Sequence, residues 1–132
     1  MGYQAEFRKG ELDDPIPFLI RVYDKEKNPI ADFIIACREW KKEVINSSDL
    51  ISLPPQIDIP VPLEENLVVL KIVDGNAQDI IDAQEVLKVT SNTQKGINFN
   101  RLFILAKKAN VLKEVKQILD ITGLTPSELP PY

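Results

Sequence analysis

A cluster of prolines in the middle of the chain most limits the folds that this sequence can adopt. Pro54, Pro55, Pro60 and Pro62 fall within nine consecutive positions. Proline has no backbone N–H and a fixed φ angle, so it interrupts helix interiors and central strands. The segment 54–62 is therefore expected to be an extended internal connection, in part an edge strand, between a front and a back half of the chain.

The length and composition favour one packed domain. The chain has 132 residues, with 44% hydrophobic and 27% charged residues, and a chain of this size can bury a core without disulfides or a metal. We predict a single domain over 1–132. Near its end, Thr125 and Glu128 stand three residues apart, as in a helix capping box, so a terminal turn and tail are expected over 125–132.

The front half contains one clear strand and one segment with two interpretations. The segment 16–23 is short and rich in β-forming residues, which predicts a buried strand. Over 29–45 apolar residues recur every three or four positions behind Asn28 and Pro29, a pair that suits a helix N-terminus. This periodicity favours a helix, while the alternative pairs 31–37 with the preceding strand as a β-hairpin.

The back half has an alternating pattern that predicts a parallel sheet. Two almost continuous apolar runs, at 66–74 and 100–106, are typical of strands buried on both faces. Each is followed by an amphipathic segment, 78–90 and 110–122, that predicts a helix. Strand–helix–strand–helix order with short links favours right-handed crossovers. The predicted fold is α/β (or α+β), with a small, largely parallel sheet and helices packed on it.

The last sixty or so residues resemble the second half of a STAS-type anti-sigma-factor-antagonist domain. The likeness consists of Leu67–Asp74 and Arg101–Ala106 as strands and of the helix that ends in Ile121-Thr122-Gly123-Leu124. Where that family has a phosphorylatable Asp-Ser-Ser-Gly turn, this chain has Gly75-Asn76-Ala77-Gln78, which lacks a hydroxyl. The resemblance therefore assigns no functional residue to this chain.

The absence of histidine excludes many kinds of chemistry. Without histidine, Ser-His-Asp and Cys-His catalysis and histidine-ligated zinc sites cannot form. The single cysteine, Cys37, allows neither an internal disulfide nor a cysteine-rich metal site. We predict no cofactor, no metal and a reducing, cytoplasmic compartment. No apolar run approaches the roughly 20 residues of a membrane span, and no leader peptide is expected.

The best candidate binding site lies where the predicted strands end. In open α/β sheets ligands bind beyond the carboxyl ends of the strands. A cation, a phosphate-bearing ligand or a charged group of a partner could bind there. The residues expected at these ends are Asp24, Asp74, Asn76, Lys107 and Lys108.

A basic segment gives a second, nucleic-acid hypothesis. Over 95–116 cations outnumber acids, and the candidate phosphate contacts are Lys95, Arg101, Lys113 and Lys116. The net charge of −4 and the lack of interleaved aromatic residues argue against this use.

The favoured function is a non-enzymatic protein-binding or regulatory (adaptor) domain that acts through a protein partner, a second copy of the chain being one form of that partner. A small-ligand or metal-assisted enzyme at the strand ends is the first alternative. Nucleic-acid binding is the second.

Overall fold

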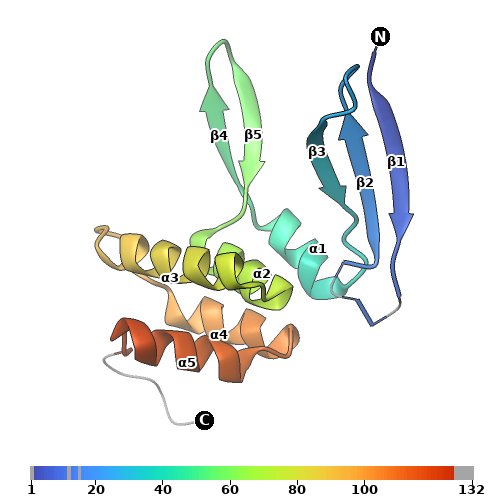
Figure 1. Ribbon diagram of the computed structural model, residues 1–132. Coiled ribbons are helices and arrows are strands. Elements are labelled where there is room, and N and C mark those ends of the chain that lie inside the picture. The colour runs from blue at the N-terminus through green and yellow to red at the C-terminus, as the bar shows by residue number, and fades with distance from the viewer. Residues whose placement is uncertain (1, 12, 15, 127–132) are drawn as a thin grey trace. The chain divides into compact units, whose positions relative to one another are not determined.

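The computed structural model of the protein describes residues 2–11, 13–14 and 16–126 (Figure 1). Its elements are five short strands and five helices in the described part of the chain. They divide into two compact units, Met1–Lys42 and Glu43–Tyr132. The expected terminal turn and tail at 125–132 lie largely outside the described residues. Each unit is described by itself below.

The first unit is a three-stranded antiparallel sheet in the order β1-β2-β3. Its strands are β1 Gln4–Lys9, β2 Phe18–Tyr23 and β3 Pro29–Ile34. The strand predicted at 16–23 is thus confirmed as β2. Because residues on antiparallel neighbours pair directly, Phe7, Ile20 and Phe33 form one row across the sheet.

The helix predicted over 29–45 is wrong, and the hairpin alternative holds for its first part. β3 pairs with β2, and the helix α1 begins only at Glu39 and ends at Asn46. Asp24 closes the hairpin, because its carboxylate accepts hydrogen bonds from the backbone N–H groups of Glu26 and Asn28 at 2.8 and 2.9 Å. Asn28 therefore belongs to a turn and does not cap a helix.

A second, two-stranded sheet contains the proline-rich segment. β4 Asp49–Leu53 and β5 Ile57–Val61 form an antiparallel hairpin. The turn between them holds a cis Pro54–Pro55 peptide bond and Gln56, whose φ is 110°. Pro60 lies in a strand with a single neighbour, where a missing N–H is tolerated.

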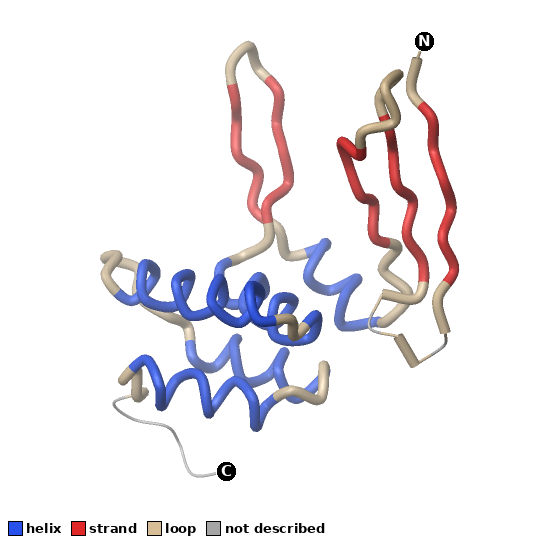
Figure 2. The backbone as a smooth tube through the Cα atoms, in the orientation of Figure 1, coloured by secondary structure: helices blue, strands red, loops and turns tan. Residues whose placement is uncertain are grey.

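Four helices carry most of the core of the second unit. They are α2 Glu64–Asp74, α3 Ala77–Ser91, α4 Phe99–Lys108 and α5 Leu112–Thr122. α2 contacts each of the other three, and Figure 2 shows all four as neighbouring tubes. The helices predicted at 78–90 and 110–122 are confirmed as α3 and α5. The buried apolar side chains on these helices are Val68, Val69, Ile72, Ala83, Leu87, Leu102, Phe103, Leu105, Ala106, Val115, Ile118 and Leu119.

The strands predicted at 66–74 and 100–106 are wrong, since both segments are helical. α2 is enclosed by three other helices, so apolar residues surround most of it and hide the 3.6-residue period. In α4 the buried residues are Leu102, Phe103, Leu105 and Ala106, a helical spacing, whereas Ile104 between them is 46% exposed.

The largely parallel sheet is therefore a wrong prediction. The described residues contain only antiparallel pairs, in sheets of three and two strands, and the fold is α+β. The strand–helix–strand–helix order behind the STAS-type resemblance is lost with the two strands. No helix in the described residues is long and apolar enough to cross a membrane.

Candidate functional site

The five residues predicted at strand ends occupy turns and helix termini. Asp24 lies in the β2–β3 turn of the first unit. In the second unit, Asp74 ends α2 and Asn76 precedes α3, while Lys107 and Lys108 form the last turn of α4. The parallel sheet edge that was expected to gather them does not exist in the described structure, so the reason for grouping them is removed.

Asp24 and Asn76 have evident local roles. Hydrogen bonds to the Asp24 carboxylate, first from the Asn28 backbone and then from its side chain, lower the pKa of Asp24. The Asn76 side chain caps α3 by accepting a hydrogen bond from the backbone N–H of Asp79 at 2.9 Å. These contacts explain both residues without a ligand.

Two of the predicted nucleic-acid contacts, Lys95 and Arg101, form ion pairs with nearby acids. Lys95 lies 3.3 Å from Glu64, and Arg101 lies 3.2 Å from Glu65. Lys113 and Lys116 are exposed on α5. Because at least two of the four cations are paired, the described surface offers a weaker basic patch than the sequence suggests.

One face of the three-stranded sheet is apolar and open. Strand register places eight residues on this face, which we call the apolar face, since all but Lys9 at the end of β1 are apolar. Phe7 and Phe33 are each 59% exposed, and no residue of the three strands is buried. Phe7 and Phe18 stack with their ring centroids 6.0 Å apart. The apolar residues of this face are Ala5, Phe7, Phe18, Ile20, Val22, Ala31 and Phe33.

The opposite face of the sheet carries paired charged groups beside the apolar Leu19 and Ile34. Arg21 forms a bidentate ion pair with Asp32, with N–O distances of 2.7 and 2.8 Å. Glu6 accepts hydrogen bonds from the Tyr23 hydroxyl at 2.9 Å and from Arg8, and these lower the pKa of Glu6, the tyrosine contributing most. The sheet therefore carries the paired charges of Glu6, Arg21 and Asp32 on one side and its three phenylalanine rings on the other.

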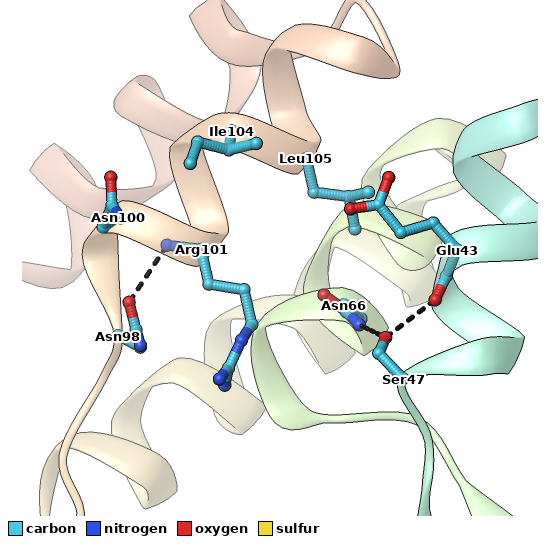
Figure 3. A pocket seen from close by; sticks show the side chains of 8 residues that line it. All are labelled: Glu43, Ser47, Asn66, Asn98, Asn100, Arg101, Ile104 and Leu105. Carbon is cyan, nitrogen blue, oxygen red and sulfur yellow. Dashed lines mark hydrogen bonds between the residues drawn. The ribbon is translucent and has the colours of Figure 1, made fainter.

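A polar pocket of about 310 Å³ lies within the second unit (Figure 3). The N-terminal turn of α4 supplies one wall, with Asn98, Asn100 and Arg101; Asn98 also caps that helix through its side-chain oxygen. The other wall comes from the end of α1 and the start of α2. The residues of that wall are Glu43, Ser47 and Asn66, and Ile104 and Leu105 complete the lining.

Buried Glu65 fixes the position of Arg101. The Glu65 side chain is 1% exposed and accepts hydrogen bonds from the Asn98 backbone N–H at 2.7 Å and from Arg101 Nη1 at 3.2 Å. A buried carboxylate requires such partners, because an unpaired charge away from water is costly. The sequence prediction missed this pair, although Asn98 at a helix-capping position before an apolar run was a signal for α4.

A smaller hollow between α4 and α5 shares Asn100 and Ile104 with this pocket. It measures about 190 Å³ and is lined by Phe103, Ile104, Leu112 and the amine-bearing Lys107 and Lys116. Among the described residues, no group of three or more acids and cysteines is placed to hold a metal ion. Comparison of the chain with protein-family models, with curated proteins and with solved structures finds no match in any of the three.

Proposed function

We propose that the chain is a protein-binding module of a reducing, cytoplasmic compartment, and that it binds an amphipathic helix of a partner on the apolar face. The single observation that carries this proposal is the exposure of Phe7 and Phe33 beside the half-buried Ile20. An apolar patch of this kind, bordered by polar residues, is typical of an interaction surface.

The first unit is small and has no layer of its own that covers the apolar face. Met1–Lys42 buries none of the described side chains of β1, β2 or β3. A sheet with one apolar face gains stability only when another layer removes that face from water. A bound partner would supply this layer.

The dimensions of the apolar face favour a single helix as the occupant. Three strands span about 10 Å between the outer two, and six residues extend about 20 Å. A helix is 10–12 Å wide, and about 13 residues cover 20 Å.

Two neighbouring residues of β3 allow a matched test. Phe33 lies on the apolar face and Ile34 on the opposite face, and they are 59% and 49% exposed. Photo-crosslinking amino acids at 33 or at 34 would first trap contacts in cells. Mass spectrometry of the adducts then identifies the partner segment, which is synthesised and titrated against the purified chain.

We expect position 33 alone to trap a partner segment. The synthesised segment should become helical on binding, as circular dichroism would report. Phe33→Asp should weaken binding at least tenfold, while Ile34→Asp should leave it unchanged. Equal trapping from both positions, trapping only of a second copy of the chain, or a segment that binds without helix formation would each contradict the proposal.

A further inference from the structure

We propose that the polar pocket of the second unit binds a free α-amino acid with an apolar side chain, as its zwitterion. The inference goes beyond protein binding, because it concerns a different site in a different unit. Three features carry it: a wall of hydrogen-bond donors, a wall of acceptors facing it, and an apolar patch between them (Figure 3).

The donor wall suits a carboxylate. Arg101 uses Nη1 to reach Glu65, and among the described residues Nε and Nη2 of Arg101 have no acceptor. The Asn98 side-chain oxygen caps α4 by accepting a hydrogen bond from the backbone N–H of Arg101, and its amide NH₂ remains as a donor. A guanidinium with an adjacent amide is well suited to a carboxylate, which accepts several charge-assisted hydrogen bonds.

The acceptor wall suits an ammonium group. Glu43 Oε2 lies 2.7 Å from Lys108 Nζ, and Oε1 accepts no hydrogen bond from the described residues. Asn66 is 4% exposed and donates to the Ser47 hydroxyl at 3.0 Å. The Asn66 oxygen accepts no hydrogen bond from the described residues, and none of their fully buried side-chain nitrogen or oxygen atoms lacks a partner. The Asn66 oxygen is therefore not fully buried, and it points away from Ser47 in the pocket (Figure 3).

The charges around the pocket favour a zwitterion over a simple anion. Arg101 is already balanced by buried Glu65, and Glu43 by Lys108. A ligand with a net negative charge would face two carboxylates, whereas one with both charges meets a complementary group on each wall. The volume of about 310 Å³ lies at the lower end of the range for small-molecule sites, and Ile104 and Leu105 can contact an apolar side chain.

Leucine and two of its derivatives separate the two walls. The probes are L-leucine, N-acetyl-L-leucine, which lacks the ammonium group, and L-leucinamide, which lacks the carboxylate; binding to the full chain is measured by isothermal titration calorimetry. We expect L-leucine to bind at least about tenfold more tightly than either derivative. Equal affinity for L-leucine and either derivative, or no binding of L-leucine up to about 10 mM, would overturn the proposal.

Variants of each wall extend the test without removing the buried ion pair. Glu43→Gln should reduce the affinity for L-leucine to that for N-acetyl-L-leucine, which itself should not change. Asn98→Asp retains a capping oxygen but replaces the donor by an anion, so it should abolish L-leucine binding while α4 stays folded. Glu85→Gln on α3 removes an exposed acid that is likewise paired with a lysine, Lys88, and should have no effect. Loss of binding in this control, or L-leucine binding unchanged by both wall variants, would contradict the assignment.

Discussion

Lys71 links two helices by pairing with two carboxylates at once. Its amine lies 3.0 Å from Asp79 and 3.0 Å from Asp82, and Asp79 is largely shielded from solvent. The hydrogen bonds to Asp79 and then to Asp82 raise the pKa of Lys71. Since α2 and α3 are joined only by Gly75 and Asn76, this cluster helps to hold the two helices in register.

Replacing Lys71 should destabilise the second unit. We expect Lys71→Met to lower the free energy of unfolding by about 1–2 kcal/mol, because two acids lose a charged donor in a partly buried place. Urea unfolding followed by circular dichroism gives the value. Lys88→Met, which breaks an exposed pair with Glu85, should cost less than about 0.5 kcal/mol. Equal losses of unfolding free energy in the two variants would show that the Lys71 cluster stabilises the unit no more than an exposed ion pair does.

Asp82 should make stability depend on acidity. Hydrogen bonds from Gln78 and then from Lys71 lower the pKa of Asp82 below that of the unfolded chain. Its stabilising contribution is therefore complete above the unfolded pKa of about 4 and is lost as the pH falls through the folded pKa. From about pH 5 down to about pH 3, the urea concentration at the unfolding midpoint should fall more steeply for the natural chain than for Asp82→Asn. Parallel curves would contradict this.

At the scale of elements, the assignment of α4 can be checked by two neighbouring substitutions. In a strand, side chains 102 and 104 would lie on one face, whereas in the helix Leu102 is 0% exposed and Ile104 is 46% exposed. Leu102→Ala should cost about 2–5 kcal/mol and Ile104→Ala less than about 1 kcal/mol in unfolding free energy. Similar costs in urea titrations would favour a strand.

The end of α2 depends on a left-handed backbone at Gly75. Its φ is 68°, and a Cβ there would lie 3.3 Å from the Ile72 carbonyl oxygen. Gly75→Ala should therefore lower the free energy of unfolding by about 1–2 kcal/mol. Gly123 has a φ of 69°, but no atom of the described residues lies within 4 Å of the added carbon, so Gly123→Ala should cost about 1 kcal/mol or less. A larger loss at Gly123 in thermal unfolding would contradict this ranking.

At the scale of the whole molecule, the two units should differ in their resistance to opening. The fully shielded side chains of α2, α3, α4 and α5 belong to Glu43–Tyr132, whereas the strands of Met1–Lys42 have none. Hydrogen exchange read by mass spectrometry should find the slowest amides in α2 and α4 and faster ones in β1 and β3. Slower exchange in β1 than in α4 would contradict this distribution of stability.

The sequence by itself determined the features that depend on local pattern. β2 and the amphipathic helices α3 and α5 follow from β-forming residues and from a clear 3.6-residue period. The lack of histidine and of paired cysteines fixes which catalytic and metal chemistries the chain can offer. These properties need no knowledge of what each segment packs against.

Only the tertiary structure decided the state of α2, β3 and α4. The apolar run of α2 suits either a buried strand or a buried helix, and contact with three helices selects the latter. Periodicity favoured a helix at Pro29–Ile34, but pairing with β2 outweighed it. The polar pocket depends on Glu65, Asn66 and Arg101 meeting across more than thirty positions of sequence, because packing, which no local pattern encodes, brings them together.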